Sequence, residues 1–232
     1  MDKSKLMVFN DEIDFLFHTN IVEYDMVAAS VSVCERYKLL PKEKIEWLKL
    51  LPKDRRTREM GMMQKDKEFS DKMISGLLET RDRFIEVNQI KDSDIISLHS
   101  DALFFVMKHE IENKVNNIEF KMKNQYCAYM KYDKHIEMFY TGESIDFKQV
   151  NKDLISQHAL GINMYLNKIF EKIENYDETV VEYIAEMNSK YLQDKLPDFF
   201  YLPWGKLGKY KIDNLQLFSF LANVVIKELR SW

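Results

Sequence analysis

Two apolar runs flank a short polar centre between Asp94 and Val106, in the order Asp-Ile-Ile-Ser-Leu-His-Ser-Asp-Ala-Leu-Phe-Phe-Val. Runs rich in β-branched and aromatic residues, separated by a few polar ones, predict a β-hairpin. The polar centre carries one carboxylate, Asp101, and a second predicted strand over residues 20–27 ends with another, Asp25. If the two strands are neighbours in one sheet, their ends bring the two acids together.

The remaining segments show helical or strand patterns, grouped in blocks along the chain. Helices are expected over residues 28–38, from Pro41 to Leu50, over 53–88 with Gly61 and Ser70 as boundaries, and over 154–174, 178–192 and 213–230. Short strands are expected over residues 117–122, 125–131, 135–141 and 145–150. This order of elements is typical of an α+β fold in which helices are segregated from an antiparallel sheet.

Composition excludes several classes of protein. The chain has 232 residues, is 46% hydrophobic and has a net charge of -4, which suits a globular domain with a buried core. No apolar run is long enough to span a membrane, so no membrane partner is expected. The two cysteines, Cys34 and Cys127, lack metal or redox spacing and predict reduced thiols in a cytoplasmic, intracellular protein.

Asp25 and Asp101 are suited to phosphoryl-transfer chemistry. Polymerase-type sites hold two divalent ions about 3.5–4 Å apart, and Mg²⁺ needs only a few carboxylates because it keeps waters and substrate phosphates as ligands. The backbone carbonyl of Met26 could complete the coordination, and alternation along the strand puts Glu23 on the same face as Asp25. The alternative is that Asp25 caps the following helix and Asp101 occupies a turn.

These residues resemble known motifs. Residues 23–30, Glu-Tyr-Asp-Met-Val-Ala-Ala-Ser, resemble motif A of template-dependent polymerases. Residues 98–104, Leu-His-Ser-Asp-Ala-Leu-Phe, resemble motif C of family B DNA polymerases, with Asp101 as the second acid and His99 where the first acid usually stands. Residues 123–129 are similar to the Lys/Tyr strand that touches the primer-template in that family, and residues 145–150 to the strand after it.

The resemblance implies a minimal polymerase core without an exonuclease domain. It implies a palm over residues 1–39 and 93–152, helical fingers over 40–92 and a helical thumb over 153–232. The implied activity is a template-dependent nucleotidyltransferase, a DNA polymerase or primase-like enzyme of a virus or plasmid, with Mg²⁺ or Mn²⁺. Its implied partners are primer-template nucleic acid, nucleoside triphosphates and replication proteins. Implied catalytic and metal-binding residues are Asp25, Asp101 and Met26, and implied nucleic-acid contacts are His99, Lys123, Tyr126 and Lys148.

A basic stretch from Lys42 to Lys67 holds nine Lys and Arg residues against five acids. Fingers helices of the family present such residues to the incoming triphosphate, which implies a role for Arg55, Arg56, Arg58 or Lys65. Arg58 and Lys65 are two turns apart and share a helix face, although a solvated face is the alternative. Polymerases that exclude ribonucleotides usually place a bulky side chain five residues after the motif A acid. Ser30 stands there, which predicts contact with the sugar and weak discrimination.

Two other functions stay open. A palm-like binding or regulatory subunit without catalysis is favoured by His99 in place of an acid and by the mild net charge. A different nucleotide enzyme on a similar sheet, such as a cyclase, would need a base-recognition pocket that the sequence does not locate. The aromatic residues between 199 and 204 predict either a base-stacking surface or an anchor for the C-terminal helix.

Overall fold

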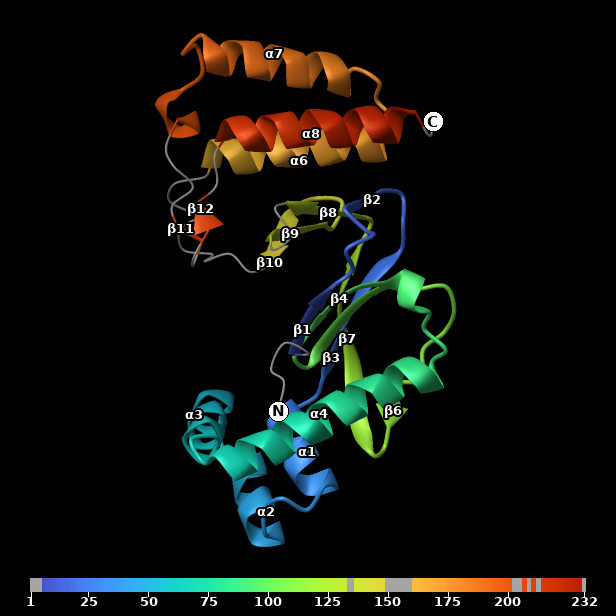
Figure 1. Cartoon of the computed structure of the whole chain (residues 1–232), viewed down its shortest axis with the longest axis vertical. Coiled ribbons are helices and arrows are strands. Elements are labelled where there is room, and N and C mark those ends of the chain that lie inside the picture. The colour runs from blue at the N-terminus through green and yellow to red at the C-terminus, as the bar shows by residue number, and fades with distance from the viewer. Residues whose placement is uncertain are drawn as a thin grey trace. The chain divides into compact units, whose positions relative to one another are not determined.

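The computed structural model describes residues 6–132, 136–148, 160–201, 206–207, 210–211 and 214–230. The chain divides into two compact units, whose elements are labelled in Figure 1. Unit 1 is Met1–Asn10 with Val22–Gln125, and unit 2 is Asp11–Ile21 with Tyr126–Trp232. Each combines antiparallel strand pairs with helices, which confirms the predicted α+β class.

Unit 1 is built on a six-stranded sheet in the order β1-β4-β5-β3-β7-β6. These strands are β1 (Met7–Phe9), β3 (Ile21–Met26), β4 (Ile95–His99), β5 (Ala102–Val106), β6 (Lys114–Val115) and β7 (Ile118–Tyr126). β4 and β5 form the predicted hairpin, with Leu98 opposite Leu103 and His99 opposite Ala102. Asp25 lies in β3, and Asp101 directly precedes β5. These two strands are neighbours in the sheet.

Four helices of unit 1 lie between β3 and β4 in the sequence. They are α1 (Ala29–Arg36), α2 (Lys42–Leu50), α3 (Lys53–Met63) and α4 (Lys67–Val87), followed by the short 3₁₀ helix η2 (Asp92–Asp94). The predicted boundaries at Gly61 and Ser70 are wrong, because the chain breaks between α3 and α4 instead. Asp66 caps α4 by accepting a hydrogen bond from the Phe69 N–H over 2.9 Å. The N-cap at Asp66 sets the boundary between the helices. Gly61 does not, because a helix tolerates an internal glycine at a cost of about 1 kcal/mol.

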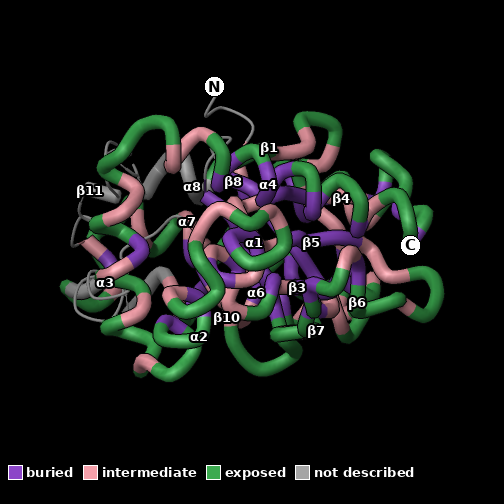
Figure 2. Tube along the Cα trace, turned by 90° about the horizontal axis from the view of Figure 1, so that it is seen from below, coloured by how far each residue is buried: buried purple, intermediate pink, exposed green. Residues whose placement is uncertain are grey.

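The core of unit 1 lies on one face of its sheet. Val22 and Tyr24 of β3 pack there with Phe105 of β5 and with Leu77 and Phe84 of α4, and β3 and β5 are largely buried in Figure 2. Since side chains alternate along a strand, this arrangement directs the odd-numbered residues of β3 to the opposite face. The acids of β3 are therefore kept out of the apolar core by register alone.

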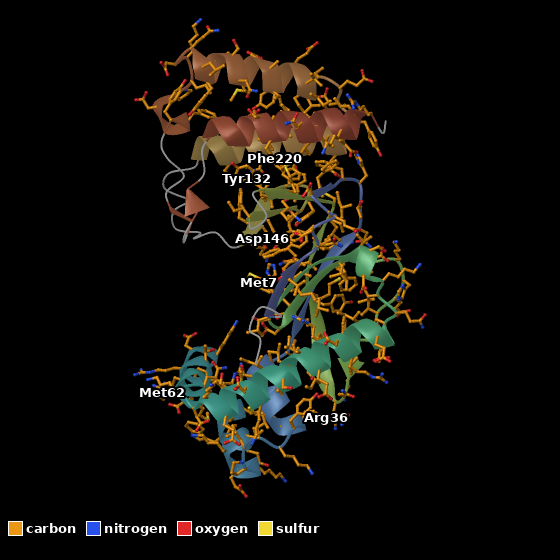
Figure 3. All side chains as sticks on the ribbon, in the orientation of Figure 1. Met7, Arg36, Met62, Tyr132, Asp146 and Phe220 are labelled. Atoms are coloured by element: carbon orange, nitrogen blue, oxygen red, sulfur yellow. The ribbon has the colours of Figure 1, made fainter. Side chains whose placement is uncertain are left out.

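Unit 2 is built on a four-stranded sheet in the order β10-β9-β8-β2. Its strands are β2 (Phe15–Leu16), β8 (Ala128–Tyr132), β9 (Ile136–Tyr140) and β10 (Ile145–Lys148), and its helices are α6 (Leu160–Glu174), α7 (Val180–Leu192), α8 (Asn214–Leu229) and the 3₁₀ helix η3 (Asp198–Phe200). β11 (Lys206–Leu207) pairs antiparallel with β12 (Tyr210–Lys211). Tyr132 of β8 lies against Phe220 of α8, with ring centroids 5.3 Å apart (Figure 3).

Several predicted elements and domain boundaries differ from those in the structure or lie outside the described residues. β1 and β2 were not anticipated, since each is very short. The segment expected as fingers, residues 40–92, lies wholly within unit 1, whereas the segment 93–152 is divided between the units after Gln125. The start of the helix expected from residue 154, and residues 202–204 of the aromatic segment, lie outside the described residues. Among the described residues no helix is long and apolar enough to cross a membrane.

Candidate functional site

Asp25 and Asp101 line the same cavity of unit 1. Asp25 is the fifth residue of β3, and Asp101 occupies the turn between β4 and β5. The backbone N–H of Met26 donates to the carbonyl oxygen of Asp101 over 3.0 Å, which fastens the end of β3 to the hairpin turn. Two residues near the acids have positive φ angles, 50° at Ser100, next to Asp101, and 49° at Ala28, three residues after Asp25. Such backbone costs of order 1–3 kcal/mol and is often kept at functional sites.

The surroundings of the two carboxyl groups act on them in opposite directions. Burial raises the pKa of Asp25 above its ordinary value, and the negative charge of Asp101 raises it further, while Lys123 and Lys53 lower it. Burial also raises the pKa of Asp101. The hydrogen bond from its own backbone N–H and the positive charges of Lys123 and Lys53 lower that pKa, but by less. Acidic groups that are held together in a partly dry cavity gain most from a further cation.

Glu23 lies on the same side of β3 as Asp25 but is already engaged. It is buried, and one oxygen lies 3.0 Å from Lys123 Nζ while the other accepts a hydrogen bond from Asn124 Nδ2 over 2.6 Å. Lys123 Nζ also lies 3.8 Å from Asp25 Oδ2. Within the described part of the chain, no group of three or more His, Cys, Asp or Glu residues could hold a metal ion. The donor set is thus two carboxylates, which fits an ion that takes its other ligands from water and substrate.

The cavity around the two acids has a volume of about 520 Å³. Its walls come from the end of β3, the start of α1 and one face of α3, and the contributing residues besides the acids are Met26, Ala28, Ala29, Ser30, Val31, Lys53, Arg56, Thr57, Met60, Gly61 and Gln64. The α3 residues recur at intervals of three and four, as one face of a helix requires. This face places two cations, Lys53 and Arg56, opposite two acids.

An adjoining cavity of about 380 Å³ has a different character. It shares Ala29, Ser30, Gln64 and Asp101 with the first, and its other lining residues are Leu6, Ser70, Met73, Ile74, Leu77 and Ser100. None of these other residues is charged. A ligand that spans both cavities would therefore place an anionic part near α3 and an uncharged part near α4.

Only some of the residues predicted to contact a triphosphate line the cavity of the two acids. Ser30 and Arg56 line the cavity, whereas Arg55, Arg58 and Lys65 do not. The shared helix face predicted for Arg58 and Lys65 is wrong, because α3 ends at Met63 and Lys65 lies in the turn after it. Lys53 was missed, although it precedes Arg56 by three residues in the basic stretch. The sequence shows that spacing but not which side of α3 meets the acids.

His99 lies among aromatic rings instead of in the cavity. Its ring centroid is 5.7 Å from that of Phe9 and 4.9 Å from that of Phe104. It is not among the residues that line either cavity. The nucleic-acid contact expected for His99 stays a prediction, and the position that resembles a motif C acid lies outside both cavity linings.

Tyr126 and Lys148 meet in unit 2 around a third residue. The third residue is Asp146, which Figure 3 labels. Its Oδ2 accepts a hydrogen bond from the Tyr126 hydroxyl over 2.9 Å and lies 2.7 Å from Lys148 Nζ. Tyr126 is buried against Phe139, with ring centroids 5.0 Å apart. Asp146 was not predicted from the sequence, yet it contacts two of the four residues expected to contact nucleic acid, Tyr126 and Lys148.

One protein family matches the chain over nearly its whole length. The model of the family described as Bacteriophage PBS1 gene 130 protein matches residues 3–232. The chain belongs to this family. No curated protein matches the chain.

Proposed function

We propose that this chain is a template-dependent nucleotidyltransferase, a DNA polymerase or primase-like enzyme that depends on divalent metal ions. The observation that carries the proposal is the meeting of Asp25 and Asp101 in one cavity, opposite Lys53 and Arg56. Two acids beside two cations suit a substrate that brings both a metal ion and phosphate groups. The family match names a phage protein and leaves this activity as a proposal.

Asp25 and Asp101 would hold Mg²⁺ or Mn²⁺, with the Met26 carbonyl as a further oxygen ligand. When bound, the metal supplies charge neutralisation and activation of a hydroxyl group. Lys53 and Arg56 bind phosphate oxygens from the α3 side of the cavity. Ser30 stands where the two cavities join, so it faces the part of a nucleotide that links phosphate to base. Lys123 compensates Glu23 and thereby keeps that buried acid from competing for the metal.

We assign the parts of a polymerase core on this basis. The six-stranded sheet with its β4–β5 hairpin acts as the palm, and α2, α3 and α4 act as fingers. The helices α6, α7 and α8 of unit 2 act as the thumb. The neighbouring positions of β3 and β5 support the assignment, because they put the residues that resemble motifs A and C at adjacent strand ends.

The test is extension of a labelled primer on a template by the purified chain, with Mg²⁺ or Mn²⁺. Asp25→Asn and Asp101→Asn are each expected to abolish incorporation. Asp92→Asn is the matched control, since Asp92 is exposed in η2 and lines neither cavity. The proposal is overturned if both acid variants retain incorporation, or if the unaltered chain incorporates nothing with either metal.

A palm-like binding or regulatory subunit is the second candidate. It is favoured by two observations, the engagement of Glu23 by Lys123 and Asn124 and the placing of His99 among aromatic rings. Both reduce the number of metal ligands relative to an ordinary polymerase site. This candidate predicts nucleic-acid binding that Asp101→Ala leaves unchanged and an absence of incorporation in the unaltered chain.

A further inference from the structure

α3 and the turn that follows it carry exposed cations that have no acidic partner among the described residues. Arg55 and Arg58 project from the helix and Lys65 from the turn after it, and all three are exposed. Met62 lies between them, 46% exposed, and is labelled in Figure 3. Among the residues that the structure describes, none of the three cations makes an ion pair.

Acidic residues stand at suitable positions on the same helix, yet they do not pair with these cations. Asp54 precedes Arg58 by four residues, and Arg55 precedes Glu59 by four, the spacing at which opposite charges on a helix usually meet. Elsewhere in unit 1 the same spacing does produce a pair, as in Lys72 Nζ and Glu68 Oε1 at 2.6 Å. The cations of α3 thus remain available to a partner outside the chain.

Arg55, Arg58 and Lys65 form a row of cations, called the stripe below. The geometry of this stripe suits a strand of nucleic acid. With 1.5 Å of rise per residue, α3 is roughly 12 Å long from Arg55 to its last residue, Met63, and Lys65 follows two residues later in the turn. A strand in stacked geometry has one phosphate for about every 3.4 Å, so the stripe spans about four phosphates. Because a helix with its side chains is about 10–12 Å across, a strand on this side runs one helix diameter from the cavity that Lys53 and Arg56 line.

We propose that Arg55, Arg58 and Lys65 bind the phosphate backbone of a single-stranded nucleic acid, which is the template strand next to the cavity. Only the word template rests on the proposed function, since the binding itself requires no catalysis. The positive charges of the three side chains complement the negative charges of a phosphate backbone, which favours nucleic acid as the partner. A membrane-binding helix would need a broad apolar face beside its cations, and this side of α3 offers Met62 alone.

The test measures binding of a labelled 20-nucleotide DNA strand (about that length covers the stripe and its flanks) as salt is raised, without metal or nucleotide. Arg55→Ala, Arg58→Ala and Lys65→Ala are combined in one variant. Each lost phosphate contact on a single strand lowers the slope of log affinity against log salt by about 0.7, so the slope should fall by about 2. The control combines Lys72→Ala with Arg83→Ala, which removes cations already paired with Glu68 and Glu86 and should leave the slope unchanged.

Each outcome decides the question. A slope that stays the same in the triple variant overturns the proposal, as does a loss of slope that appears only with duplex DNA, anionic vesicles or an acidic peptide. Repeating the measurement with Asp25→Asn and Asp101→Asn separates this proposal from the proposed function, because those variants should bind the strand normally. A chain that binds in this way and never incorporates nucleotides would sink the catalytic proposal and keep this one.

Discussion

The backbone N–H of Met26 donates to the carbonyl oxygen of Asp101 over 3.0 Å, and the next residue, Val27, donates to the carbonyl oxygen of Glu119 over 2.8 Å. The end of β3 is therefore held by main-chain bonds on both sides, to the hairpin turn and to β7. Because these bonds involve no side chain, the two carboxylates of the cavity can be altered without loosening the frame that positions them.

Neutralising either acid is expected to stabilise the protein while it abolishes incorporation. The pKa of each carboxyl group is raised in the folded state, above its ordinary value of 3.8, so stability is greatest when the group is protonated and falls as pH rises through the folded pKa. At pH 7, Asp25→Asn and Asp101→Asn should each raise the unfolding temperature, by roughly 2–4 °C for each kcal/mol gained. Thermal unfolding at several pH values measures this, and the difference should vanish below the ordinary pKa. A lower unfolding temperature at pH 7 would contradict it.

Arg56 and Arg55 form a matched pair for triphosphate binding. They are adjacent in α3, but only Arg56 lines the cavity. Loss of a hydrogen bond to a charged group costs about 1.5–3 kcal/mol, so Arg56→Ala should weaken nucleoside triphosphate binding roughly 10- to 150-fold. Arg55→Ala should leave it unchanged. Titration calorimetry with each variant gives the comparison, and equal losses would place the triphosphate elsewhere.

Ser30 predicts weak discrimination between the two sugars. It lines both cavities beside Ala29, so small side chains bound the place where they join. Primer extension with ribonucleotides and with deoxyribonucleotides in separate reactions should give similar rates. Ser30→Tyr should favour deoxyribonucleotides by roughly 10- to 200-fold through steric conflict, while Ser30→Ala should not. Strong rejection of ribonucleotides by the unaltered chain would end this expectation.

Two glycines should respond in opposite directions to alanine. A Cβ on Gly76 of α4 would come within 2.8 Å of Tyr37 Cδ2 and 2.9 Å of Val33 Cγ1 in the neighbouring α1 segment, whereas one on Gly61 of α3 would meet nothing within 4 Å. Gly76→Ala should lower the free energy of unfolding by about 1–3 kcal/mol through overpacking. Gly61→Ala should raise it by about 0.5–1 kcal/mol through helix propensity. Denaturant unfolding checks both, and an equal shift in the two variants would contradict the packing.

Local patterns were enough for the hairpin, because Asp94–Val106 carries its own turn and its own two strands. The same holds for the helices after Pro41 and Pro52. Local patterns failed at the break between α3 and α4, because Gly61 predicts a boundary there while the chain breaks at the N-cap residue Asp66. They also did not show that Arg56 lines the cavity while Arg55 and Arg58 do not. The sequence gives the spacing of these cations but not the side of the helix that faces the acids.

The amino-acid sequence alone determined that this chain arranges its strands and helices in separate blocks, that Asp25 and Asp101 end or join strands, and that a basic helix stands between them. These properties follow from periodicity and turn chemistry within short segments. Only the tertiary structure decided that β5 pairs beside β3, that Lys123 compensates Glu23, and that Lys53 and Arg56, not Arg58 and Lys65, face the acids. Those facts depend on which faces the core buries, and that choice is made by packing between segments far apart in the chain.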